Sequence, residues 1–157
     1  PVSVYVAKST RPVNINQSGG MVAVPVGSRQ APGSSGFVWP AGVRVVTQYF
    51  TWKHNDLDND GPMSTPIYAS KAGTVSISQC GWNGGYGCYV IVDHGGGFST
   101  RYGHDSRLLV VPGEYVETGQ TIALMGNTGN VRGVTGIHLH FEVRVNGRAV
   151  NPLGYVR

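Results

Sequence analysis

The sequence predicts an all-β protein, with an antiparallel, sandwich-like sheet in a single domain. Short segments rich in Val, Tyr and Thr recur along the chain with turn residues between them, and no segment keeps a helical period for three turns. Twenty-four glycines and only 13% charged residues also suit many tight turns. A chain of 157 residues is most simply one domain, which would bury roughly 68–70% of its unfolded surface.

Residues 1–36 differ in composition from the rest of the chain. NINQSGG and GSRQAPGSSG are linker-like runs, whereas PVSVYVAKST and GGMVAVPVGS each offer a short strand. We therefore expect an N-terminal extension or linker with possible short strands over 1–36, followed by the folded domain over 37–157.

From residue 37 onward the sequence is typical of strands separated by turns. Asn146-Gly147 is the strongest hairpin signal in the chain. SRLLVV begins like a helix, but Pro112 and Gly113 end that pattern. The expected strands lie within VRVVTQYF, TPIYASKAGTVSISQ, CYVIVDH, FSTRYGH, YVETGQTIALMG and HLHFEVRVNGRAV.

The two cysteines, Cys80 and Cys88, flank a glycine-rich loop that suits a hairpin. They either form a disulfide across two strands, as an exported protein would allow, or remain buried free thiols. No CxxC or Cys/His finger spacing occurs, which argues against a structural cysteine–zinc site.

Charge and hydropathy exclude several classes of function. The net charge is +4, but the basic residues are scattered, so we expect no nucleic-acid partner. A diffuse positive surface suits an anionic polymer such as bacterial cell wall equally well. No apolar run approaches the ~20 residues that a transmembrane helix requires, so we expect no transmembrane segment in this chain.

Two histidines stand one residue apart in TGIHLHFEV. If this segment is a strand, His138 and His140 share one face, while Leu139 and Phe141 point towards a core on the other. Two imidazoles on one face would repel each other if both were protonated. A chemical role is therefore as reasonable as a strand that happens to contain histidines.

Other histidines and acidic residues have the types that a zinc site needs. A catalytic zinc site takes three nitrogen or carboxylate ligands and keeps a position open for water. His54 and Asp58, four residues apart, are suitable partners for the paired histidines. The run from Asp56 to Asp60 also opens like an EF-hand calcium loop, but its twelfth position is Ile67 rather than Glu and no helices flank it.

From about residue 37 to its end, the chain resembles the lysostaphin-like (LytM-type) zinc metalloendopeptidases, which hydrolyse peptidoglycan. Three motifs carry the resemblance: HxxxD at His54 and Asp58, a separate histidine in Tyr-Gly-His104, and HxH at His138 and His140. Four longer stretches around these motifs also resemble the family and occur in the same order: TPIYASKAGTV, GYGCYVIVDHGGGFSTRYGH, GQTIALMGNTG and NGRAVNPLGY.

The resemblance implies a β-sheet fold with a groove that holds one Zn²⁺ ion. It implies that His54, Asp58 and His140 are the zinc ligands, and that His104 and His138 are the catalytic pair. Within this pair we expect His138 to act as the base and His104 to stabilise the oxyanion.

The implied activity is hydrolysis of peptide cross-links or stem peptides of peptidoglycan through a zinc-activated water. The alternative is a non-hydrolytic relative that binds cell wall or activates an amidase. Such relatives generally lack motif residues that this chain keeps. We expect an extracytoplasmic monomer that binds peptidoglycan peptides. Candidate substrate contacts, which could equally be loop-packing residues, are Trp52, Trp82, Tyr86 and Arg132.

The chain departs from the family pattern around Asp58. The family usually has Gly at the position of Asp56, and apolar or small residues at those of Asn59 and Asp60. Asp56 or Asp60 remains an alternative ligand to Asp58, although either choice would break the register of the following residues 65–68.

Overall fold

The computed structural model describes residues 36–133 and 135–156. The short strands expected within 1–35 lie outside the described residues. The division of the chain near residue 36 therefore stays a prediction.

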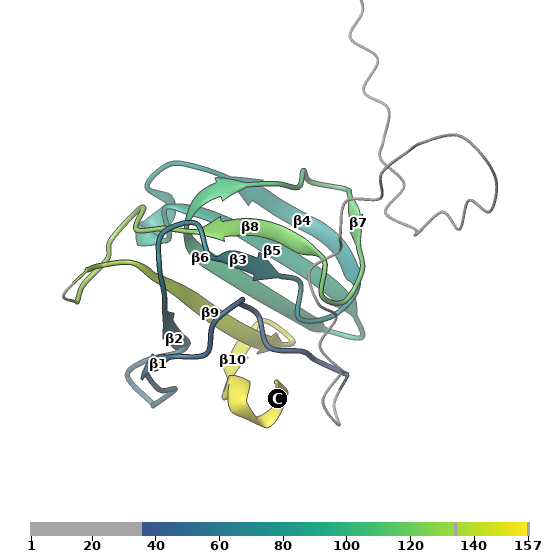
Figure 1. Ribbon diagram of the computed structural model, residues 1–157. Coiled ribbons are helices and arrows are strands. Elements are labelled where there is room, and N and C mark those ends of the chain that lie inside the picture. The colour runs from purple at the N-terminus through teal and green to yellow at the C-terminus, as the bar shows by residue number, and fades with distance from the viewer. Residues whose placement is uncertain (1–35, 134, 157) are drawn as a thin grey trace, which may run out of the picture.

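The described residues form a protein built almost entirely of β-strands (Figure 1). Every pairing between the named strands is antiparallel, which confirms the predicted fold class. The strands are β1 (Val46–Gln48), β2 (Leu57–Asp60), β3 (Pro66–Tyr68), β4 (Gly73–Gln79), β5 (Cys88–Gly95), β6 (Phe98–Leu108), β7 (Tyr115–Val116), β8 (Thr121–Met125), β9 (His138–Val145) and β10 (Arg148–Val150); two short 3₁₀ turns are η1 (Asn83–Gly85) and η2 (Pro152–Gly154).

The strands join into one branched sheet. Its main path has the order β1-β2-β9-β6-β5-β4-β7, and β10 pairs with β9. The long strand β6 pairs with β5 and β9 over its first part and with β8 over its last part, and β8 in turn pairs with β3. In Figure 1, β3 and β8 lie in front of β5 and β6, which gives the sandwich-like shape that the sequence predicts.

The core lies between these layers and follows the alternation of the strands. Leu139, Phe141 and Val143 of β9 are fully buried, as expected for the core face of that strand. Ile67 of β3 and Ile122 of β8 belong to the same buried cluster. Because one face of β9 is held in this core, the histidines of the opposite face are fixed in direction.

Strand β2 is buried although it is mainly polar. Asn59 is 0% exposed, and its amide is satisfied by the backbone, since it accepts from Val45 N–H and donates to the Val43 carbonyl. Asp60 accepts a hydrogen bond of 2.7 Å from the Thr47 hydroxyl. These hydrogen bonds explain why polar residues can stand in β2, because the side chains of Asn59 and Asp60 both have partners.

Two hairpins match the sequence signals. Asn146 and Gly147 have φ angles of 49° and 77°, and they connect β9 to β10 in the turn type that an Asn-Gly pair favours. Cys80 and Cys88 form a disulfide that closes the loop between β4 and β5. The disulfide interpretation is therefore confirmed, and the free-thiol alternative is wrong.

Loss of this disulfide is expected to destabilise the domain. Replacing both Cys80 and Cys88 with serine should lower the free energy of unfolding by about 2–3 kcal/mol, because the crosslink restricts the unfolded chain. Thermal or urea unfolding of the double variant measures this. An unchanged midpoint would contradict a stabilising crosslink.

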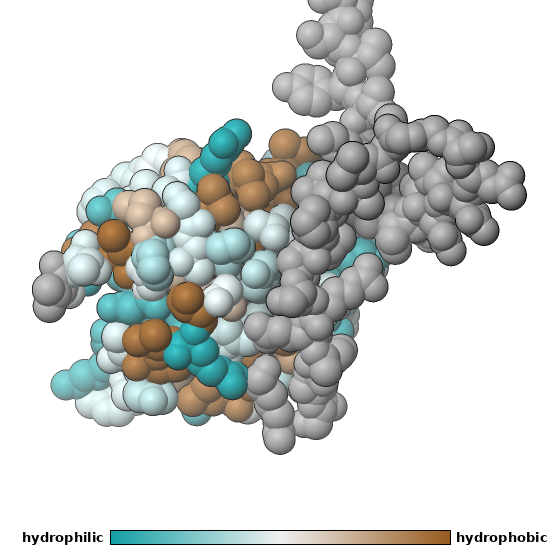
Figure 2. Space-filling model, viewed as in Figure 1, coloured by the Kyte–Doolittle hydropathy of each residue, from teal (hydrophilic) through white to brown (hydrophobic). Residues whose placement is uncertain are grey.

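The surface seen in Figure 2 carries several separate hydrophobic patches with hydrophilic or intermediate residues between them. Exposed apolar side chains in this arrangement are ordinary for a folded domain. Within residues 36–133 and 135–156, no helix has the length and apolar character needed to cross a bilayer.

Candidate metal centre

Strands β2 and β9 bring the first and third histidine motifs together. They pair antiparallel, with Asp58 opposite His140 and Asp60 opposite His138. Directly opposite residues on paired strands point to the same face. The four side chains therefore lie on the face turned away from the core.

His54 precedes β2, in a turn where it exchanges two backbone hydrogen bonds with Thr51. Its Nδ1 lies 3.1 Å from both the carbonyl oxygen and Oδ1 of Asp56, so this nitrogen carries the proton of the neutral ring. Its Nε2 is then the acceptor, and it lies 3.4 Å from Oδ2 of Asp58. His54 can therefore bind a metal ion through Nε2.

Asp58 is buried with one oxygen unsatisfied. It is 8% exposed, and its Oδ1 has no hydrogen bond, although it lies 3.6 Å from Nε2 of His138. Burial, followed by the neighbouring Asp56 carboxylate, raises the pKa of Asp58 to about 7. A divalent cation would offset both effects, because it favours the ionised form of both carboxylates.

Glu142 orients His140. It lies two residues further along β9, and His140 donates a hydrogen bond of 2.9 Å from Nε2 to its Oε1. Nδ1 of His140 is left facing Asp56, at 2.6 Å from Oδ2. Burial disfavours charge on His140, but the contacts with Asp56 and Glu142 outweigh it and raise its pKa to about 9.

Glu142 is itself held ionised by a set of donors. It is 1% exposed and accepts hydrogen bonds from the Tyr86 hydroxyl and from the guanidinium groups of Arg101 and Arg144. Burial would raise the pKa of Glu142, but His140 and the two arginines lower it to about 2. Sequence reasoning missed this residue, although an acidic side chain two positions after His140 on a strand must share its face.

His104 lies where β6 changes its pairing partner. The strand pairs with β9 as far as Gly103 and with β8 from Asp105 onward. Between them, His104 has a φ of 64°, a left-handed conformation that is uncommon for a residue with a side chain. Backbone strain of this kind, about 1–3 kcal/mol, is often found at functional sites.

The ring of His104 is held by the loop that follows β8. Its Nδ1 donates a hydrogen bond of 2.8 Å to the carbonyl oxygen of Thr128, so Nε2 is the acceptor in the neutral ring. Burial lowers the pKa of His104 to about 4 despite this hydrogen bond. The Thr128 loop also packs closely on Gly87, where an added Cβ would lie 2.4 Å from the Thr128 backbone and φ is 68°.

The two histidines of the expected catalytic pair are neighbours. The ring centroid of His104 lies 4.7 Å from that of His138 and 5.6 Å from that of His140. Burial lowers the pKa of His138 as well, so both members of the pair favour the neutral state.

The residues around Asp58 fit a zinc ion. His54, Asp56 and Asp58 each offer a ligand atom within 4.8 Å of the others, and His140 adjoins this group through Asp56. Imidazole nitrogen and carboxylate oxygen are ligands that zinc takes. Two buried oxygens, Oδ2 of Asp56 and Oδ1 of Asp58, have no hydrogen bond. The structure thus brings all five predicted site residues together, with Asp56, one of the two alternative ligands, among them.

Of the predicted substrate contacts, Tyr86 adjoins the cluster, whereas Tyr102 and the fifth histidine, His94, have structural roles. Trp52 and Trp82 are 85% and 66% exposed, and the Tyr86 ring packs edge-on against His140 at 5.1 Å. Tyr102 is fully buried and is a core residue. His94 bonds Ala72 and Thr100, a structural role.

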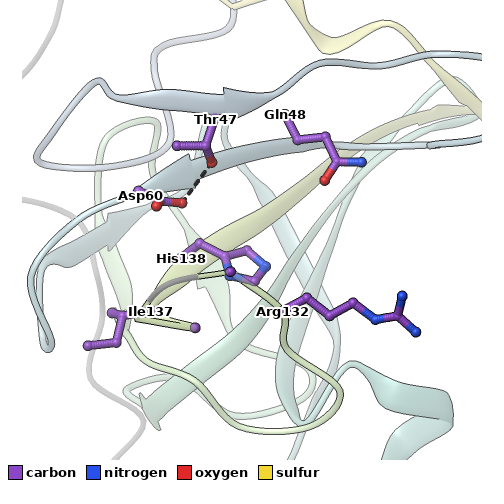
Figure 3. A pocket seen from close by; sticks show the side chains of 8 residues that line it. Thr47, Gln48, Asp60, Arg132, Ile137 and His138 are labelled. Atoms are coloured by element: carbon purple, nitrogen blue, oxygen red, sulfur yellow. Dashed lines mark hydrogen bonds between the residues drawn. The ribbon is translucent and has the colours of Figure 1, made fainter.

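A pocket of about 320 Å³ adjoins the cluster at His138 (Figure 3). β1 forms one wall of it, and the segment after Asn130 forms another. In this view Asp60 and Arg132 lie on opposite sides of His138. The pocket therefore carries an anionic and a cationic side chain beside the histidine pair.

Comparison with known proteins decides the family. Peptidase family M23 matches residues 52–152, which include all three histidine motifs. The chain belongs to peptidase family M23. This confirms the resemblance found in the sequence.

Two relatives illustrate the M23 match. The chain is 37% identical over 127 residues to a lipoprotein NlpD/LppB homolog of Pseudomonas aeruginosa, an alignment that covers 80% of this chain and 41% of that protein. It is 46% identical over 101 residues to the peptidoglycan DD-endopeptidase ShyA of Vibrio cholerae, covering 64% of this chain and 22% of the relative. This M23 chain thus spans less than half the length of both relatives.

Solved structures agree with the fold. A zinc-containing peptidase from Vibrio cholerae superposes with a TM-score of 0.68 at 33% identity, over 73% of this chain and 38% of that one. The antimicrobial peptidase lysostaphin from Staphylococcus simulans superposes with a TM-score of 0.60 at 28% identity, over 71% of this chain and 48% of that one. The M23 fold therefore extends over most of the described residues.

Proposed function

We propose that this M23 chain is a zinc-dependent endopeptidase that hydrolyses peptide bonds of bacterial peptidoglycan. The observation that carries the proposal is the convergence of imidazoles and buried, unsatisfied carboxylate oxygens on one face of β2 and β9. Membership of family M23 and a relative named as a peptidoglycan DD-endopeptidase support the choice of substrate.

His54, Asp58 and His140 would hold the zinc ion. His54 offers Nε2 and His140 offers Nδ1, because the other nitrogen of each ring is bonded to Asp56 or Glu142. Bound zinc supplies Lewis acidity, which polarises a carbonyl and lowers the pKa of water towards neutrality. The hydrogen bonds on the outer nitrogens fix both rings for this role.

His104 and His138 would handle protons during hydrolysis. A neutral imidazole can accept the proton of the attacking water and later deliver it to the leaving amine. The sequence favours His138 as this base, and its Nε2 lies 3.6 Å from Asp58. The bond to Thr128 leaves His104 with an acceptor nitrogen too, so a donor role towards an oxyanion requires its protonated form.

The pocket beside His138 would bind the peptide on one side of the scissile bond. Stem peptides carry free carboxylate and amino groups, which suit Arg132 and Asp60 respectively. The pocket lies next to the histidine pair and outside the metal cluster. We therefore assign it a role in binding substrate and not in the chemical step.

Replacement of Arg132 with alanine is expected to raise KM by about 5–30-fold, equivalent to 1–2 kcal/mol, with little change in kcat. Steady-state hydrolysis of a defined cross-linked muropeptide measures both constants. Arg148→Ala, an exposed arginine on β10, is the matched control. Equal KM values for Arg132→Ala and the control would contradict a substrate-binding role of the pocket.

An extracytoplasmic location follows from this substrate, and the lipoprotein named among the relatives supports a place in the cell envelope. The Cys80–Cys88 disulfide suits the same environment. We propose that the protein acts there as a monomer. The non-hydrolytic alternative makes a different prediction, which is binding of peptidoglycan without release of peptide fragments.

A further inference from the structure

The Asp56 carboxylate occupies the space between two of the proposed zinc ligands. It is only 4% exposed. Its Oδ1 lies 3.1 Å from Nδ1 of His54, and its Oδ2 lies 2.6 Å from Nδ1 of His140.

The contact between Asp56 and His140 lacks the geometry of a hydrogen bond. Oδ2 of Asp56 has no hydrogen-bond partner, despite its short distance to the ring. His140 already donates from Nε2 to Glu142, so Nδ1 is the ring nitrogen that faces Oδ2 of Asp56. Atoms this close need a proton or a metal ion between them, and a bound zinc ion would take the place of that proton.

A second carboxylate oxygen faces the same region. Oδ1 of Asp58 is buried and also lacks a hydrogen bond. Two buried carboxylates side by side are costly without a positive partner, because each is desolvated and each repels the other. A cation bound between them and the histidines would supply that partner.

We propose that Asp56 is a fourth protein ligand of the zinc ion, through Oδ2, in addition to His54, Asp58 and His140. Its Oδ1 remains free to accept the Nδ1 proton of His54, which would orient that ring as a supporting carboxylate does. The inference rests on the proposed function only in taking the cluster to be a zinc site. It makes the site more anionic than three ligands would.

A fourth protein ligand would occupy the position that a catalytic zinc site usually keeps open for water. A tetrahedral site with four protein ligands has no place for water, whereas catalytic zinc can expand to five ligands. Asp56 would therefore favour retention of the metal, and a catalytic role would require the site to accept a fifth ligand or to release this carboxylate.

A crystal structure of the zinc-loaded protein tests the inference directly. We expect Oδ2 of Asp56 at about 2.0–2.2 Å from the zinc ion, the usual zinc–carboxylate distance. The inference would be overturned if His54, Asp58 and His140 bind the zinc ion while Oδ2 of Asp56 lies more than about 3 Å from it. That separation is a hydrogen-bond distance and is too long for coordination.

Zinc affinity in solution gives a second readout that does not depend on hydrolysis. By competition with a chromophoric chelator, Asp56→Gly and Asp56→Asn should each raise the zinc Kd by at least about 100-fold, above the 10–100-fold typical of a residue that only supports a ligand. Asp60→Asn is the matched control for loss of one nearby negative charge, and its Kd should stay close to that of the wild type. Thermal melts establish that each variant is folded.

The outcomes separate the inference from the proposed function. A wild-type protein that binds no zinc would contradict both. Zinc binding by the wild type with an unchanged or lower Kd in Asp56→Gly would overturn only the inference, because Asp56 would then compete with zinc for His140.

Discussion

Replacing His140 with alanine is expected to abolish peptide hydrolysis and to weaken zinc binding by more than ~100-fold. His140 supplies the one proposed ligand on β9 through Nδ1, which faces Asp56 because Nε2 is bonded to Glu142. Without this imidazole, the remaining proposed ligands all come from the short segment 54–58. Zinc content after dialysis, measured beside turnover, checks the prediction.

His94→Ala is the control for this variant, because His94 is bonded to Ala72 and Thr100 and lies outside the cluster. It should keep its zinc even where it loses stability. If His140→Ala keeps its zinc while His138→Ala loses it, the assignment within the HLH motif is reversed.

Replacing His138 or His104 with alanine is expected to lower activity while zinc stays bound. Neither residue is a proposed ligand, so zinc content should stay near that of the wild type. Loss of the residue that acts as the general base should lower kcat on the order of 10²–10⁴-fold. Metal analysis and single-turnover kinetics on the same samples measure both effects.

The pH dependence of kcat/KM identifies which of the two histidines is the base. Burial lowers the pKa of both, to about 4 for His104, so both rings are neutral at pH 7 and charge only at lower pH. Activity should therefore fall on the acid side below the ordinary histidine pKa of about 6.5. The variant whose residual activity loses this acid limb has lost the base. An acid limb that persists in both variants, at pH values where they still hold their zinc, would contradict a base role for either.

Much of the fold could be predicted because its signals are local. Alternation in HLHFEV places Leu139 and Phe141 in the core and both histidines on the opposite face. The Asn146-Gly147 pair specifies its own turn, and the spacing of the cysteines matches the β4–β5 hairpin. The branching of the sheet at β6 could not be predicted, because it depends on which distant strands pair with each half of one long strand.

The site was predictable as a set of residues but not as a network. The motifs identify His54, Asp58 and His140, yet the place of Asp56 depends on the register between β2 and β9, which brings its carboxylate to His140. The role of Glu142 depends on partners far away in the chain, such as Tyr86. Such contacts between distant residues are not encoded in the spacing of any one motif.

The central claim, that this chain is a zinc peptidase of the cell wall, is tested most directly by mass analysis of muropeptide digests. Purified protein is incubated with defined cross-linked muropeptides as isolated, after removal of metal by a chelator, and after return of zinc. We predict peptide fragments whose masses sum to the substrate plus one water, loss of these fragments with the chelator, and their return with zinc. Muropeptides that remain intact with zinc-loaded protein would contradict the claim and favour a non-hydrolytic, wall-binding role.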